Sequence, residues 1–150
     1  MVEESKIDAL VKAAVLAGLD GVEFIQDFDY ATLCREYNGI GPEWAGAAAR
    51  QFVTRRLSIF EPPALIHDMR NYKSDGSRKA FHAANDEFLH NCLKIINAHY
   101  HEDEKKYAKA RAAVFAMYAF VAGPGGWMAW ADCNARNLSR KERSERKESL

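Results

Sequence analysis

The chain has few cysteines and no excess of charge, and both features exclude whole classes of protein. Its three cysteines, at positions 34, 92 and 133, are an odd number, which argues against a disulfide framework and favours a reducing compartment. Acidic and basic residues number 21 each, so net charge gives no sign of nucleic-acid binding. The opening residues MVEESKIDAL lack the layout of a signal peptide. We therefore expect synthesis in the cytoplasm, with a non-classical route as the alternative for delivery outside.

Long strand patterns and nucleotide-binding loops are missing as well. The glycine-rich run at residues 123–126 is not followed by the Lys and Ser or Thr that would bind a phosphate. What the chain does have is length and apolar content, since 150 residues of which 48% are hydrophobic suffice for one domain with a core. We predict an all-α fold, a single domain of five or six helices over residues 1–150, in which residues 137–150 form a fraying charged tail.

Apolar periodicity and the positions of proline and glycine indicate where these helices lie. A first amphipathic helix is expected from about Ser5 to Gly18, followed by a mostly irregular stretch over residues 19–41. Pro42 is well placed to begin a second helix that ends near Leu57. The remaining helices are expected at residues 62–72, 79–96, 103–122 and 127–147.

The two helices on either side of the KSDGSR turn carry a possible catalytic pair. His67 lies nine residues before Gly76 and Asp86 lies ten residues after it, so an antiparallel pairing places the two side chains roughly level. These two helices are the predicted centre of the fold. A carboxylate that faces an imidazole fixes its tautomer and stabilises its protonated form, which suits a general base. Asp68, next in sequence to His67, could hold a metal ion.

Three short motifs together resemble a known enzyme family. They are the run Y-x-G-x-G that begins at Tyr37, the dipeptide His67-Asp68, and the run DEFLHNCLK that begins at Asp86. This combination is similar to the secreted and viral-capsid phospholipase A2 families and covers about residues 37–94. The resemblance implies calcium-dependent hydrolysis of the sn-2 ester of a phospholipid, and it makes a phospholipid or membrane surface the expected partner.

The resemblance also implies a role for each matching residue. His67 would activate water, Asp86 would orient His67, and Tyr72, one position later than the family's usual tyrosine, is the candidate for substrate binding. Calcium prefers several oxygen ligands in a flexible geometry, and glycines let a loop turn its carbonyls toward one ion. The implied calcium ligands are the carbonyls of Tyr37, Gly39 and Gly41 and the carboxylate of Asp68.

Two alternatives from other classes stay open. His82, Asp86 and His90 recur at every fourth residue and so share one helical face. With His67 and Asp68 opposite, they could bind zinc, iron or manganese in a metal-dependent hydrolase. The other alternative is a non-catalytic helical interaction protein in which the phospholipase-like site is vestigial.

Residues 112–131 form an uncharged run of nearly the length that crosses a bilayer. The glycines and proline at 123–126 interrupt it, which favours a buried core helix followed by a tryptophan-bearing loop. Alternatively, Trp127, Met128 and Trp130 could lie at a lipid headgroup interface. The basic residues of the C-terminal tail would then be attracted to anionic lipid, or they could form a solvated helix whose charges pair.

Overall fold

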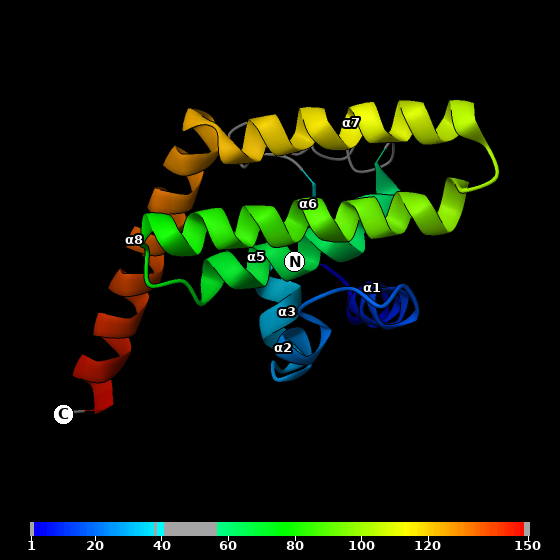
Figure 1. Cartoon of the computed structure of the whole chain (residues 1–150). Coiled ribbons are helices and arrows are strands. Elements are labelled where there is room, and N and C mark those ends of the chain that lie inside the picture. Colours follow the sequence, from blue (N-terminus) through cyan, green and yellow to red (C-terminus); the bar gives the residue numbers. More distant parts are fainter. Residues whose placement is uncertain (1, 38, 41–56, 149–150) are drawn as a thin grey trace.

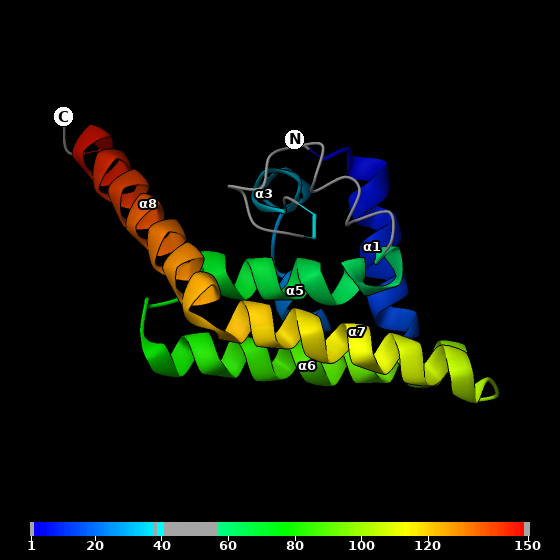
Figure 2. The same cartoon turned by 90° about the horizontal axis from the view of Figure 1, so that it is seen from above.

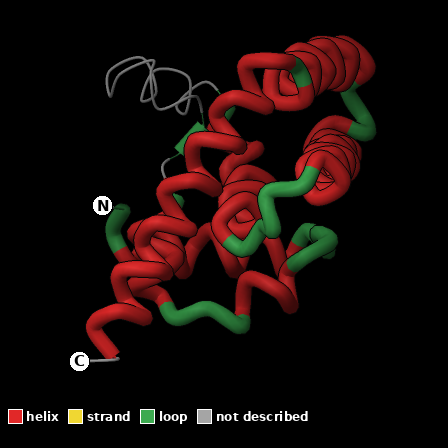
Figure 3. Tube along the Cα trace, turned by 90° about the vertical axis from the view of Figure 1, so that its left-hand side faces the viewer, coloured by secondary structure: helices red, strands yellow, loops and turns green. Residues whose placement is uncertain are grey.

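The computed structural model describes residues 2–37, 39–40 and 57–148, and within these ranges the chain is helical with no strand. The all-α prediction is confirmed. Figure 3 shows the helices and their short connections. The elements are α1 (Glu4–Leu16), α2 (Val22–Gln26), α3 (Tyr30–Glu36), the 3-10 turn η2 (Ser58–Phe60), α5 (Glu61–Tyr72), α6 (Arg78–Tyr100), α7 (Glu104–Ala122) and α8 (Pro124–Glu148).

The stretch expected to be irregular contains two short helices, which raises the helix count above the five or six predicted. Gly21 precedes α2 with a φ of 85°, a left-handed conformation that glycine adopts without a steric penalty. The carboxylate of Asp29 caps α3 by accepting a hydrogen bond from the Thr32 amide at 2.7 Å. Helices of five and seven residues are too short to show an apolar period. The helix expected to begin at Pro42 lies outside the described residues.

The central pair of helices is α5 and α6, as the sequence predicts. Pro62 and Pro63 occupy the first turn of α5, where a missing amide hydrogen breaks no helical bond. Gly76 has a φ of 79° in the turn, and the Ser77 hydroxyl accepts from the Ala80 amide at 3.1 Å to cap α6. The two helices pack through a continuous apolar core that includes Leu65, Ile66, Met69, Phe88, Cys92 and Ile96.

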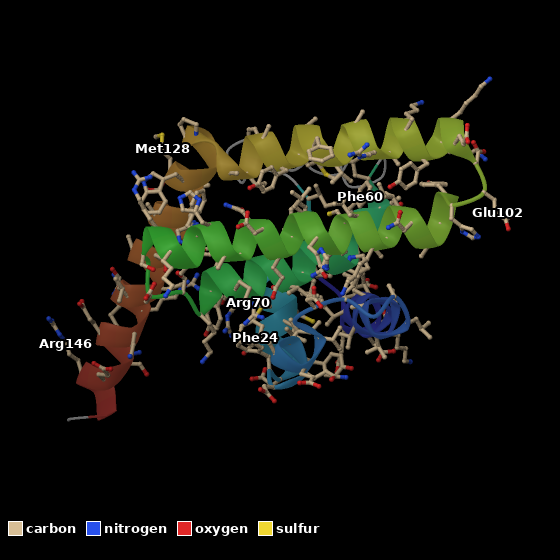
Figure 4. All side chains as sticks on the ribbon, in the orientation of Figure 1. Phe24, Phe60, Arg70, Glu102, Met128 and Arg146 are labelled. Atoms are coloured by element: carbon tan, nitrogen blue, oxygen red, sulfur yellow. The ribbon has the colours of Figure 1, made fainter. Side chains whose placement is uncertain are left out.

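The other helices lie around this pair. α7 runs along α6, while α1 and the short helices α2 and α3 lie against α5 (Figure 1). Arg70 of α5 joins two of these elements, since its guanidinium bonds to Glu87 of α6 at 2.9 Å and lies 4.0 Å from the ring centroid of Phe24 in α2 (Figure 4). α8 leaves the end of α7, crosses the α5–α6 pair at one end and projects beyond the body of the molecule (Figure 2).

The uncharged run becomes the second half of α7 and the start of α8. α7 is not the buried core helix that was expected, because Val114 is its one buried side chain while Phe115 and Phe120 are exposed. Among the described residues no single helix is long and apolar enough to cross a membrane. The pair α7 and α8 meets these criteria only when taken together, and a bend of 55° separates them. The charged tail is helical through Glu148.

Candidate functional site

His67 lies on α5 at the interface with α6, in a largely apolar setting. Its side chain is 17% exposed, and its ring centroid lies 5.3 Å from that of Phe88. The Nε2 atom of His67 lies 2.8 Å from the Oδ1 atom of Asn85, a side chain that is only 1% exposed. Because an amide oxygen can only accept a hydrogen bond, Nε2 carries the hydrogen and donates it. The interaction fixes both the orientation and the tautomer of the imidazole.

Asn85 therefore occupies the place that was expected for Asp86. The sequence spacing brings the correct turn of α6 to His67, but each residue of a helix is rotated by about 100° from the last. Asp86 consequently faces α7, where its Oδ1 accepts a hydrogen bond from the Tyr118 hydroxyl at 2.9 Å. The carboxylate of Asp86 raises the pKa of this Tyr118 hydroxyl. In this structure a neutral amide, and not a carboxylate, orients the imidazole.

Asp68 lies beside the other nitrogen of His67. The Nδ1 atom of His67 is 3.9 Å from the Oδ1 atom of Asp68, whose side chain is 29% exposed. With the hydrogen on Nε2, the Nδ1 atom holds the free lone pair of the neutral ring. The basic nitrogen thus faces the same side as the carboxylate that was predicted to hold a metal ion.

The first part of the Y-x-G-x-G run is also brought to α5. Tyr37 is buried, with its hydroxyl donating to the Glu61 Oε2 atom at 2.9 Å. Burial, first, and then the charges of Glu61 and Asp68 raise the pKa of Tyr37. Gly39 has a φ of 84°, and Gly41 lies outside the described residues.

These groups fit a hard cation by their chemistry. Asp68 supplies a carboxylate, and the main-chain carbonyls of Tyr37 and Gly39 are oxygen donors of the kind that calcium binds. The Glu61 carboxylate nearby is already engaged, because Lys6 lies 2.7 Å from the same Oε2 atom that accepts from Tyr37. Of the calcium ligands expected from the sequence, Tyr37, Gly39 and Asp68 lie within the described residues.

Tyr72 does not extend toward His67. The two residues are five positions apart on α5, which corresponds to a large rotation around the helix. The ring of Tyr72 instead packs edge-on against Phe28, with 6.1 Å between the ring centroids. Its main-chain carbonyl accepts a hydrogen bond of 3.4 Å from Asn137 of α8. The structure thus gives Tyr72 a packing role and does not bring it to the imidazole.

The histidines of the alternative metal site have separate partners. His90 Nε2 lies 3.4 Å from Asp20 Oδ2, and the ring of His82 packs against Phe81 with 5.3 Å between centroids. Asp86, between them in sequence, bonds to Tyr118. In the described part of the chain, no group of three His, Cys, Asp or Glu side chains is close enough to hold a metal ion.

Sequence reasoning missed the residue that covers His67. Trp130 of α8 is only 2% exposed, and its ring centroid lies 6.1 Å from that of His67 and 5.5 Å from that of Phe81. Trp127 is half-buried against Phe81, with the Arg78 guanidinium 4.4 Å from its ring centroid. Of the three residues considered for a headgroup interface, Met128 alone is exposed. Its position at the α7–α8 corner is visible in Figure 4.

Comparisons with protein-family models, with curated proteins and with solved structures found no match. The function must therefore be inferred from the residues around His67.

Proposed function

We propose that the protein hydrolyses a carboxylic ester of a phospholipid in a calcium-dependent, phospholipase A2-like reaction. One observation supports this proposal above the others. Asn85 holds Nε2–H of His67 at 2.8 Å, which leaves the basic Nδ1 on the side of Asp68, 3.9 Å away. A base and a candidate metal ligand thus lie next to each other on α5.

In the proposed reaction, His67 acts as a general base and then as a general acid. Nδ1 takes a proton from water while the water oxygen forms a bond to the ester carbonyl carbon. The bond from that carbon to the alcohol oxygen then breaks, and the imidazolium returns the proton to the leaving oxygen. Asn85 keeps the ring in position throughout, because its amide oxygen accepts from Nε2–H in the neutral and in the protonated state.

Asp68 and the carbonyls of Tyr37 and Gly39 are the described groups that would hold calcium. When bound, this ion would supply positive charge that stabilises the oxyanion of the transition state. Glu61 of α5 binds both Lys6 of α1 and Tyr37 at the end of α3, so these contacts fix α1 and the end of α3 against α5. The apolar surroundings of His67 would exclude bulk water from the reacting ester.

A neutral orienting residue has a consequence for the rate. The amide of Asn85 fixes the ring but does not offer the negative charge with which a carboxylate stabilises an imidazolium. We expect the Asn85→Asp variant to raise kcat by about tenfold and the Asn85→Ala variant to lower it, since positioned acid–base groups contribute 10²–10⁴-fold in general. Steady-state hydrolysis of the same lipid by the three proteins measures both effects.

The proposal is tested with mixed phosphatidylcholine and phosphatidylglycerol vesicles, in millimolar calcium or in chelator. We expect release of the sn-2 fatty acid only with calcium, and a fall of about 10²-fold or more in the His67→Gln variant. His82→Gln and His90→Gln are matched controls, because both histidines lie on exposed positions of α6, and they should retain activity. An active His67→Gln protein, or activity equal in chelator, would contradict the proposal.

A non-catalytic helical interaction protein is the second candidate. The observation that favours it is the exposure of two phenylalanines of α7, Phe115 at 42% and Phe120 at 45%. A partner that packed on these side chains would bury a large apolar area for each ring. If wild-type protein releases no fatty acid and binds no calcium in calorimetry, this second candidate replaces the first.

A further inference from the structure

Helix α8 covers the candidate base. Trp130 lies between His67 and Phe81 and is almost fully buried there, although the helix that carries it has few other buried side chains. The His67 side chain is left 17% exposed. The indole therefore packs against the imidazole and shields part of it from solvent.

Beyond Trp130, polar contacts join α8 to α5 and to α3. The Asn134 amide donates to Asn71 Oδ1 at 2.9 Å, and the Asn137 amide donates to the Tyr72 carbonyl at 3.4 Å. Further along, Arg140 lies 3.2 Å from the Glu36 carboxylate of α3. Each such contact contributes little net stability, because water offers equivalent hydrogen bonds when the helices separate.

The covered arrangement leaves two hydrogen-bond donors without a partner. In the described part of the chain, the buried side-chain atoms with no partner are Asn85 Nδ2 and Trp130 Nε1. Both residues belong to the layer between α8 and the α5–α6 pair. A buried donor without an acceptor opposes the state that buries it. Opening this layer would let both groups bond to water or to the oxygens of an ester.

The connection at the other end of α8 suits a hinge. Gly123 alone separates α7 from α8, and the two helices bend by 55° there. Gly125 has open space where a Cβ would lie, whereas Gly126 lies against the Val121 backbone. Rotation about this connection would carry the polar contacts away from α5 while α7 stays on α6.

We propose that α8 is a lid over His67, closed in this structure, and that it swings about the connection at Gly123 to admit a phospholipid ester. The inference rests on the proposed function for the identity of the substrate. Its structural part, access to His67 controlled by the polar contacts of α8, does not depend on catalysis.

The test is modification of histidines by diethyl pyrocarbonate, followed residue by residue by mass spectrometry on the full chain. The other four histidines, at positions 82, 90, 99 and 101, are exposed and serve as internal references. We expect His67 to react at least about tenfold more slowly than these in the wild type. The double variant Asn134→Ala/Asn137→Ala should raise the rate at His67 by about tenfold and leave the references unchanged.

The matched control is Asn97→Ala, a change at an exposed asparagine of α6, which should leave the rate at His67 as in the wild type. Should the double variant lose its helical circular dichroism, Arg140→Ala replaces it, with a smaller increase of about twofold expected. If His67 reacts at the same rate in a folded Asn134→Ala/Asn137→Ala or Arg140→Ala variant as in the wild type, the lid proposal is wrong.

Activity separates this inference from the proposed function. A lid without catalysis gives faster modification of His67 but no fatty acid from any protein. Catalysis without a lid gives calcium-dependent release with no change in the reactivity of His67. The modification rate of His67 therefore tests the lid, and the release of fatty acid tests the proposed function.

Discussion

Removal of one hydroxyl tests the buried contact that fixes Tyr37 against α5. Tyr37 is 1% exposed, and its hydroxyl donates to Glu61 Oε2 at 2.9 Å. A hydrogen bond to a charged group contributes about 1.5–3 kcal/mol. Lys6 remains 2.7 Å from the same oxygen, so Glu61 stays paired after the substitution. We therefore expect Tyr37→Phe to lower the free energy of unfolding by about 1.5 kcal/mol, at the lower end of this range.

The raised pKa of the Tyr37 hydroxyl makes the free energy of unfolding depend on pH. Burial and the charges of Glu61 and Asp68 raise the pKa of Tyr37 in the folded protein. Below about pH 10 an unfolded tyrosine is still protonated, so the Tyr37 hydroxyl makes its full contribution to the free energy of unfolding. As pH rises further, the unfolded state loses this proton first. Stability falls by up to about 1.4 kcal/mol per pH unit from this one group.

Urea unfolding followed by circular dichroism at pH 7 and at pH 11 measures both effects. The Tyr37→Phe variant should have a lower free energy of unfolding than the wild type at pH 7. Between pH 7 and pH 11 its free energy of unfolding should fall by less than that of the wild type. Tyr30→Phe is the control, because the exposed Tyr30 hydroxyl bonds to an exposed carboxylate of Asp8 and should matter little. Parallel pH dependences for wild type and Tyr37→Phe would refute the buried contact.

Three further substitutions probe the corner of α7 and α8 and the anchor of the α1–α2 loop. Gly126→Ala would place a Cβ 1.9 Å from the Val121 carbonyl oxygen, so we expect a loss of several kcal/mol and a lower melting temperature, whereas Gly125→Ala has open space and should be neutral within about 0.5 kcal/mol. Equal melting temperatures for the two variants would show that the corner is not packed in this way. The Asn91 amide both donates to the Asp20 carbonyl and accepts from the Asp20 amide, at 2.9 and 2.8 Å. Asn91→Ala should cost about 1–3 kcal/mol in urea unfolding, and an unchanged midpoint would exclude this role.

The helices that the sequence predicts well are those whose signals are local. The α5–α6 hairpin follows from two prolines, a Gly76 turn and an apolar period on each side. The two short helices of residues 22–36 could not be predicted in this way, because they gain their stability from packing against α1 and α5. Asp29 at the start of α3 was the one local signal available.

The site was predictable to within a turn of helix but not to the residue. Counting from Gly76 brings His67 level with residues 85 and 86, yet only the rotation of α6 about its axis decides which side chain contacts the imidazole. Trp130 could not be assigned to His67 from sequence, because its position depends on the bend between α7 and α8. Long-range packing of this kind leaves no periodic signal in the chain.

The most direct test of the account is the tautomer of His67 in the folded protein. Long-range proton–nitrogen correlation spectra of nitrogen-15-labelled protein, at about pH 8 where imidazoles are mostly neutral, distinguish the two ring nitrogens. We predict that Nε2 carries the hydrogen and that Nδ1 is unprotonated, and that Asn85→Ala abolishes this preference. A His67 ring that carries its hydrogen on Nδ1 would contradict the claim that a basic nitrogen faces Asp68.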